Sequence, residues 1–238
     1  MDGFSWSLVA ASAGVALTHT LLGPDHYLPF LMLARARRWT RARTMAITVA
    51  CGAGHVASSL LLGAAGVMLG VAAAPLAHIE QVRGGLAAWA LVIFGAAYFL
   101  WGVRRAVRRA RDLEPHAHGD HVHMHAGSSA AHAHRDADAA AAPRSATTFW
   151  VLFTIFVLGP CEPMIPLFVL PASRGRWGLA IGSALLFSVL TIATMVVVTL
   201  LSLAGLRRLP FAFLERWSHA MAGAVLWASG LAIITLGL

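Results

Sequence analysis

The sequence predicts an all-α integral membrane protein with six transmembrane helices arranged as two inverted three-helix repeats. Three observations lead to this prediction: the apolar composition, six long apolar segments and two matching Gly-Pro interruptions. Apolar residues make up 58% of the chain and charged residues 12%, whereas soluble domains have about 45–50% and about 25%. The mean hydropathy is +0.72. So few charges cannot cover a soluble surface, and we therefore expect a lipid bilayer around the helices.

Six apolar segments are long enough to cross a bilayer, which takes about 20 helical residues. We expect these spans at residues 4–22, 44–71, 84–103, 148–170, 177–203 and 211–236, with a short apolar continuation of the first at 27–34. The chain then divides into three units. Residues 1–103 form the first repeat, residues 104–147 form a His-rich disordered loop, and residues 148–238 form the second repeat.

The positive charges predict the orientation of the spans. All 18 basic residues are arginines, so the formal net charge is +8. Fifteen arginines fall in connections on one side of the predicted bundle, and only Arg83, Arg174 and Arg176 fall on the other. The richer side is expected to be cytoplasmic. We therefore expect a multi-pass protein of the bacterial inner membrane with both termini outside and the His-rich loop inside. Because the basic residues lie in short loops between apolar segments, we interpret them as determinants of membrane orientation. We therefore expect no nucleic-acid partner.

The connection between the two halves is rich in histidine. Seven histidines lie close together, several of them in H-x-H spacing, at His116, His118, His121, His123, His125, His132 and His134. Closely spaced imidazoles offer interchangeable nitrogen ligands that bind divalent metals weakly and reversibly. The segment has no apolar periodicity, which is typical of disorder. A pH-responsive polar linker is the alternative interpretation.

Two interruptions suggest an internal repeat. Gly23-Pro24-Asp25-His26 in the first half matches Gly159-Pro160-Cys161-Glu162 in the second. Further along each half, the same order recurs in Glu80, Gly95 and Gly102 and in Glu215, Gly230 and Gly237. Inverted three-helix repeats with broken helices are typical of transporters whose site lies near the middle of the membrane. Chance similarity between apolar segments is the alternative.

Polar side chains gather around these interruptions, where each costs a few kcal/mol at the bilayer centre and so indicates function. We expect a metal site formed by His19, Asp25, His26, His55, Cys161 and Glu162. Imidazole with carboxylate suits divalent nickel, cobalt, zinc or iron. The alternatives are a solvated cluster at a helix end, helix packing around a hydrogen-bonded His55, and Glu162 paired to an arginine. No catalytic or nucleotide-binding motif is present, so we expect neither enzymatic activity nor a tightly bound cofactor.

The first interruption resembles a known family. His19, five residues and then Asp25-His26 is similar to the first-helix signature of the nickel/cobalt transporter family of the NiCoT and RcnA type, with one additional intervening residue. The layout also resembles the wider TauE/SafE-like and DsbD/LysE-type group of small transporters. The resemblance implies a small inorganic ion as substrate, nickel or cobalt first and zinc as a further candidate. A cytoplasmic His-rich loop favours export over uptake.

Two other functions stay open from the sequence. The first is export of sulfite or a related sulfur-containing anion, with arginines binding the substrate. The second is a thiol/disulfide electron carrier that uses Cys51 and Cys161. Thiol carriers need a cysteine in each half at matching positions, and Asp25 occupies the position that matches Cys161. The oligomeric state, including a homo-oligomer, also stays open.

Overall fold

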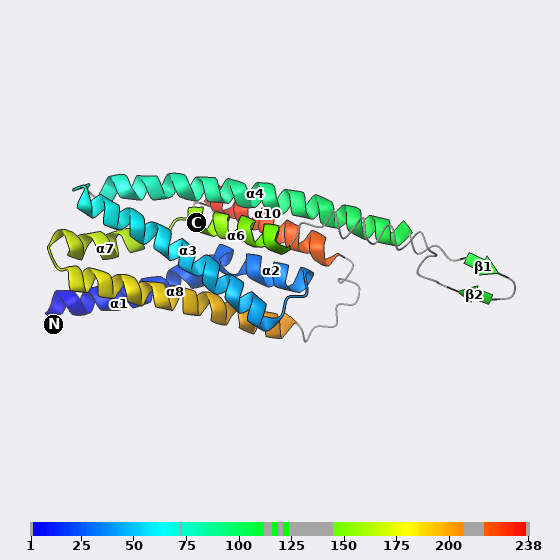
Figure 1. Ribbon diagram of the computed structural model, residues 1–238, viewed down its shortest axis with the longest axis horizontal. Coiled ribbons are helices and arrows are strands. Elements are labelled where there is room, and N and C mark those ends of the chain that lie inside the picture. Colours follow the sequence, from blue (N-terminus) through cyan, green and yellow to red (C-terminus); the bar gives the residue numbers. More distant parts are fainter. Residues whose placement is uncertain are drawn as a thin grey trace.

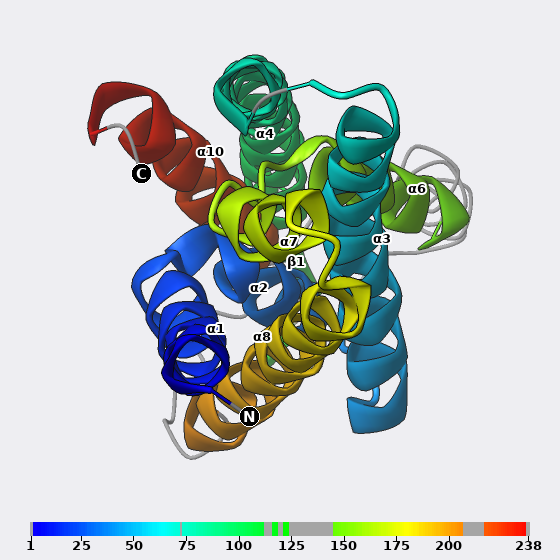
Figure 2. The same ribbon diagram turned by 90° about the vertical axis from the view of Figure 1, so that its left-hand side faces the viewer.

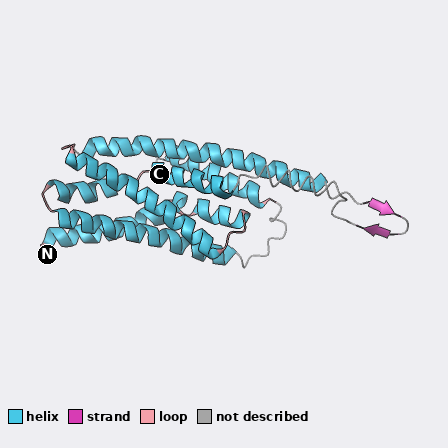
Figure 3. Cartoon of the chain, in the orientation of Figure 1, coloured by secondary structure: helices cyan, strands magenta, loops and turns pink. Residues whose placement is uncertain are grey.

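The computed structural model describes residues 2–71, 73–111, 116–118, 121–123, 145–206 and 217–236. Nearly all of this part is helical, and the helices run side by side along the long axis of the molecule (Figures 1 and 3). The helices are α1 Gly3–Leu22, the 3-10 helix η1 Pro24–His26, α2 Leu28–Ala36, α3 Arg41–Met68, α4 Ala73–Arg111, α6 Ser145–Leu158, α7 Met164–Ser173, α8 Trp177–Leu206 and α10 Ser218–Leu236.

Five of these helices are long and apolar enough to cross a membrane, namely α1, α3, α4, α8 and α10. Large apolar side chains also cover the outside of the bundle. Leu61 on α3 is 70% exposed, and Leu201 on α8 is 67% exposed. Water disfavours such a surface and lipid tolerates it. The architecture is therefore compatible with a multi-pass α-helical membrane protein.

The fourth expected span, 148–170, is not one continuous helix. It is divided into α6 and α7, which are both shorter than a membrane-spanning helix. The reason is local, because Gly159, Pro160 and Pro163 lie between the two helices, and proline lacks the N–H that a continuing helix needs. The third helix is longer than expected and begins at Ala73 instead of residue 84. The first six residues of the last expected span, 211–216, lie outside the described residues.

The first helix of each half is interrupted within the bundle. α1 ends at Leu22, η1 follows as a single tight turn, and α2 continues toward the next connection. α6 and α7 are separated in the same way around Gly159. Figure 1 shows both interruptions away from the two ends of the bundle. Backbone that leaves the helical path at this depth is tolerated only inside protein or beside a cavity.

The last helix of the first half and the last helix of the second half pack very closely against each other. α4 and α10 are antiparallel, with Gly95 opposite Trp227 and Gly223 opposite Phe99. A Cβ atom on either glycine would overlap the backbone of the facing residue. Glycine is therefore required at both positions, as in other close helix contacts within membranes.

The remaining helices surround the interruptions. Seen from one end in Figure 2, α2 and α7 lie near the centre, with α1 and α8 on one side, α3 on another and α4 with α10 on a third. α1 packs along α8, and α3 packs along α6. The interruptions are thereby placed where helices of both halves meet.

Polar contacts fix the end of the bundle where α1 begins. Asp2 caps α1 by accepting a hydrogen bond from the Ser5 amide at 3.0 Å, and it forms an ion pair with Arg176 at 3.2 Å. The Ser5 hydroxyl, followed by the Ser5 amide and Arg176, holds the pKa of the Asp2 carboxyl well below its usual range. Arg174 and Arg176 both lie over the Phe4 ring at this end.

The connection between the halves contains more regular structure than expected. Residues 104–111, predicted as the start of the loop, continue α4, because arginine and alanine are good helix formers. Two short strands follow, β1 His116–His118 and β2 His121–His123, paired antiparallel with His116 opposite His123. The intervening Gly-Asp is a dipeptide typical of two-residue hairpins. His125, His132 and His134 lie outside the described residues.

Candidate metal centre

The interruption after α1 brings two histidines together. Gly23 N–H still donates to His19 O at 3.0 Å, but Pro24 has no N–H and α1 ends before it. The chain then turns through η1, with His26 N–H donating to Gly23 O at 3.1 Å. As a result the His19 and His26 rings lie edge to face with their centroids 4.6 Å apart. A Cβ on Gly23 would lie 2.6 Å from His26 Nδ1, so this turn needs glycine.

A third histidine joins them from α3. The His55 ring lies 5.3 Å from the His26 ring and 6.3 Å from the His19 ring, measured between centroids. One ligand nitrogen from each of the three residues lies within 4.8 Å of the other two. His26 and His55 are buried, and His19 is half-buried. The pattern seen in the sequence, two histidines at the first interruption and one on the next helix, thus becomes one cluster.

Backbone carbonyls orient two of the imidazoles. His26 Nδ1 lies 3.2 Å from Gly23 O, and His55 Nδ1 lies 3.2 Å from Phe156 O. A carbonyl only accepts, so each Nδ1 carries a proton, and in the neutral ring Nε2 then keeps a lone pair. Nε2 of His19, His26 and His55 is buried in every case, without a hydrogen-bond partner among the described residues. Each such buried atom costs about 1–3 kcal/mol, and a shared cation would remove that cost.

The arrangement fits a divalent transition metal. Metal–nitrogen bonds of about 2.0–2.1 Å place two ligand nitrogens at most about 4.2 Å apart. The three nitrogens observed here lie within 4.8 Å of one another, so the rings would have to rotate toward one another for all three to bind one ion. Binding through Nε2 while Nδ1–H donates to a carbonyl is the usual arrangement of metal-binding histidines.

A cavity of about 440 Å³ adjoins the histidines. Its wall includes the three histidines, the carboxylates of Asp25 and Glu162, and mostly apolar residues of α4 and α6. No arginine is among the described residues that line it. The charged groups facing this space are therefore acidic, which favours a cation as its occupant.

The other expected ligands take different positions. Asp25 Oδ1 lies 3.3 Å from His26 Nδ1, so Asp25 contacts one of the three histidines and is not among the three clustered ligand atoms. Glu162 is exposed on the cavity wall, and no ion pair to an arginine is seen for it in the described part of the chain. Cys161 is fully buried in an apolar cluster with Leu8, Val56 and Phe187, away from the cavity lining.

The two cysteines are not paired. Cys51 and Cys161 are both free and buried. Cys51 lies one turn from His55 on α3, but it packs in a separate apolar core with Ile47 and Met195. Neither thiol lines the cavity. Both behave as small apolar residues, which is the usual role of a buried free cysteine.

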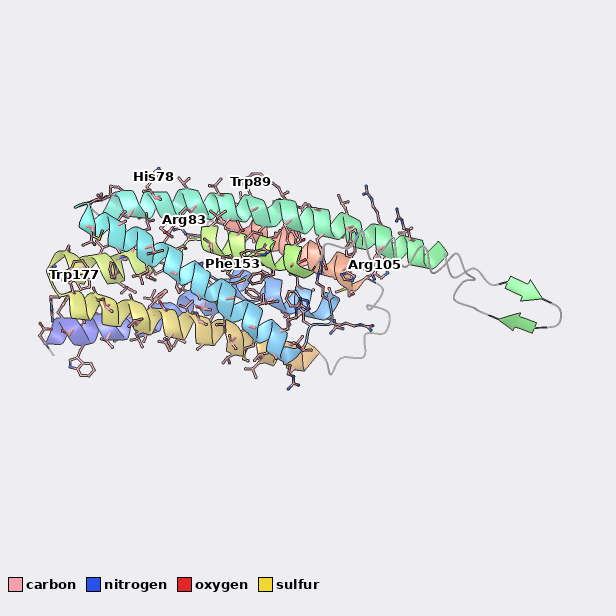
Figure 4. All side chains as sticks on the ribbon, viewed as in Figure 1. His78, Arg83, Trp89, Arg105, Phe153 and Trp177 are labelled. Atoms are coloured by element: carbon pink, nitrogen blue, oxygen red, sulfur yellow. The ribbon has the colours of Figure 1, made fainter. Side chains whose placement is uncertain are left out.

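The sequence reasoning missed a polar pair next to the site. Arg83 was expected in an outer connection, and Glu80 was used only as a marker of the repeat. The structure places both within α4, where Glu80 is fully buried and forms an ion pair with Arg83. Figure 4 labels Arg83 on the side of α4 that faces α3 and α6, whereas His78 and Trp89 lie on the opposite side. The available signal was a Glu and an Arg three residues apart at the start of an apolar segment.

Comparisons with protein families, curated proteins and solved structures gave no match to this chain. The resemblance to the nickel/cobalt transporters therefore stays an expectation from the sequence.

Proposed function

We propose that this chain is a secondary-type membrane transporter whose substrate is a divalent transition-metal ion, with nickel or cobalt first and zinc next. The observation that carries the proposal is the convergence of His19, His26 and His55, whose Nε2 atoms are buried without hydrogen-bond partners in the described structure. Imidazole ligands suit nickel, cobalt and zinc better than magnesium or calcium, which prefer oxygen. Three ligands leave coordination positions open, as a substrate that must leave again requires.

The proposed architecture is six spans in two inverted repeats, with α6 and α7 together as one broken span. The helix contacts support it, because α1 packs along α8 as α6 packs along α3. The close α4–α10 contact has the same symmetry. Gly95 faces Trp227, and Gly230 faces Val92. In the alignment of the two halves, Gly95 matches Gly230 and Val92 matches Trp227, so the two contacts occupy equivalent positions in the proposed repeats. Substrate sites of such transporters lie beside broken helices.

The proposed orientation follows the arginines. Arg35, Arg38 and Arg43 lie around the α2–α3 connection, and the last two turns of α4 at the same end contain five more arginines. Arg174 and Arg176 lie at the opposite end. Arg83 is an internal residue and no longer counts as a loop charge. The first end is then cytoplasmic, with both termini outside, in the inner membrane of a bacterium. The His-rich segment collects ions on the cytoplasmic side, which favours export.

The two rival functions have less support. A sulfur-anion exporter needs cationic groups facing the substrate, but the described cavity is lined by Asp25 and Glu162 and by no arginine. A thiol carrier needs two cysteines that can approach each other and a partner. Cys51 and Cys161 are buried in different apolar clusters.

The test is metal transport by the purified protein in liposomes. His55→Ala and His26→Ala should each abolish Ni²⁺ or Co²⁺ flux, because each removes one of three ligands. His78→Ala is the matched control, since His78 is an exposed histidine on a spanning helix and should transport like the wild type. Wild-type flux in both site variants would reject the proposal. Sulfite flux that persists in these variants would move the anion exporter to first place.

A further inference from the structure

The broken end of α6 presents two carbonyls to neighbouring helices. In a continuous helix, Phe156 O would accept the N–H of residue 160, and Val157 O would accept the N–H of residue 161. Pro160 has no N–H, and Cys161 N–H donates instead to Glu80 Oε2 at 2.9 Å. Within the helix, Phe156 O receives only a long bond of 3.2 Å from Gly159 N–H, which also donates to Ile155 O at 2.8 Å.

Two side chains from the first half use these carbonyls. His55 Nδ1 lies 3.2 Å from Phe156 O, and Arg83 Nη2 donates to Val157 O at 2.6 Å. The two carbonyls belong to consecutive residues. A shift of the α6 end that moves Val157 O away from Arg83 would therefore be expected to move Phe156 O relative to His55 as well.

Arg83 is itself part of a network of hydrogen bonds between α3 and α4. It forms an ion pair with Glu80, and its Nη2 also donates to Ser58 Oγ at 2.7 Å. Glu80 accepts further hydrogen bonds from Ser59 Oγ at 2.9 Å and from Cys161 N–H. The Glu80 carboxylate and the Arg83 guanidinium therefore link α4 by hydrogen bonds both to α3 and to the α6–α7 interruption.

The hydrogen-bond network also contacts His55 through Ser58. Ser58 and Ser59 follow His55 by three and four residues, so they lie on the same side of α3. Ser58 Oγ donates to His55 O at 2.8 Å. The bonds thus form a closed loop from His55 to the α6 carbonyls, to Arg83, to Ser58 and back to His55.

We propose that the ion pair between buried Glu80 and half-buried Arg83 is the positioning element of the three-histidine site. It fixes the broken end of α6 so that Phe156 O accepts the Nδ1 proton of His55 and Nε2 of His55 faces the metal position. Neither Glu80 nor Arg83 contacts that position. The inference deepens the proposed function and rests on it for its metal readout, but the tautomer of His55 can be measured without any metal.

The first experiment measures that tautomer in the metal-free full chain. Long-range ¹H–¹⁵N spectra of ¹⁵N-histidine-labelled protein distinguish Nδ1–H from Nε2–H, and the His55→Gln variant assigns the His55 signals. The wild type should show the Nδ1–H form. Arg83→Gln should show a mixture of tautomers, whereas Arg83→Lys should keep mainly the Nδ1–H form, because lysine retains the charge and one donor for Val157 O.

The second experiment titrates Co²⁺ and records its visible spectrum. Arg83→Gln should bind roughly 10–100-fold more weakly with an altered spectrum, the size expected for a lost outer-shell partner. Arg176→Gln is the matched control, because Arg176 is ion-paired to Asp2 at the end of the bundle. It should change neither the affinity nor the tautomer.

The outcomes separate the two proposals. An unchanged His55 tautomer and unchanged Co²⁺ affinity in Arg83→Gln would overturn the positioning role and leave the metal site intact. A tautomer shift in a protein whose wild type binds no Co²⁺ would support the positioning role and reject the transport proposal. If Arg83→Gln does not fold, Ser58→Ala removes one bond to Arg83 and should shift the tautomer in the same direction. No shift there would also overturn the positioning role.

Discussion

The two Gly-Pro interruptions have the same sequence pattern but serve the site in different ways. The first contributes two side chains, because His26 lies in the turn itself and His19 lies on the last turn of α1, and its one carbonyl contact, from Gly23 O, is to His26 of the same turn. The second contributes backbone, because Phe156 O and Val157 O accept hydrogen bonds from His55 and Arg83. An interruption that removes helical hydrogen bonds can expose either side chains or backbone carbonyls to neighbouring helices. A matching Gly-Pro pattern in the two halves therefore indicates that both have an interrupted helix, and it does not indicate that both supply the same kind of ligand.

The residues at matching positions illustrate this difference. His26 corresponds to Glu162, and Asp25 corresponds to Cys161. His26 is buried within the cluster, whereas Glu162 is exposed on the cavity wall. Asp25 contacts His26 of the cluster, whereas Cys161 donates its amide N–H to Glu80 and packs its thiol against apolar residues. Substitutions at matching positions should therefore have unequal effects.

The largest contrast should come from His26 and Glu162. His26→Ala removes a ligand, and the Co²⁺ affinity of the purified protein should fall by more than the roughly 10–100-fold caused by outer-shell changes. Glu162→Ala should leave that affinity close to the wild-type value, because Glu162 lies outside the cluster of ligand nitrogens. Isothermal titration calorimetry measures both. Equal losses in the two variants would show that the second interruption also supplies a ligand.

A smaller effect is expected from Pro160→Ala. The new residue would have an N–H that can donate to Phe156 O and compete with His55 Nδ1. The Co²⁺ affinity should fall by about 10-fold, as expected for a weakened outer-shell bond. Pro171→Ala is the matched control, because Pro171 lies inside α7 and is absent from the cavity lining. An unchanged affinity in Pro160→Ala, measured by the same titration, would show that the freed carbonyl does not matter for the site.

Much of the bundle could be predicted from the sequence, because apolar length alone locates a membrane helix. The predicted spans at 4–22, 44–71 and 177–203 agree with α1, α3 and α8 to within three residues at each end. The break within 148–170 is visible in the sequence as Gly159-Pro160, but hydropathy alone does not show that it divides the span into two short helices. The start of α4 was placed too late, because Glu80 and Arg83 lower the hydropathy of its first turns, and their pairing is invisible in a hydropathy pattern.

The site could be predicted only in part, for a physical reason. His19, His26 and His55 stood out because an ionisable group within a span is expensive unless it has a partner. The role of a backbone carbonyl cannot be read in the same way, since every residue has one. Only packing decides that Phe156 O faces His55 and that Cys161 presents its amide instead of its thiol. The three clustered histidines could therefore be predicted from the sequence, and the carbonyls that contact two of them could not.

The next contrast concerns Asp25 and Cys161. Asp25→Asn keeps the size of the side chain but loses the charge beside His26, and it should weaken Co²⁺ binding by up to about 10-fold. Cys161→Ala should not change the affinity, because the backbone amide that binds Glu80 is retained. Competition with a chromogenic chelator can rank the two variants. A larger loss in Cys161→Ala would instead identify the thiol as a ligand and reopen the redox interpretation.

The smallest effect on the membrane site should come from the His-rich connection. Deleting residues 115–134 removes all seven of its histidines, so the total number of metal ions bound per chain should fall. The Co²⁺ affinity of the membrane site should stay unchanged, because none of its three ligands and neither orienting carbonyl belongs to the deleted segment. Equilibrium dialysis with metal analysis measures both quantities. Adding His26→Ala to the deleted chain should then eliminate the remaining tight binding. If tight binding is instead lost by the deletion alone, the connection is part of the high-affinity site, and the distinction between a collecting segment and a membrane site fails.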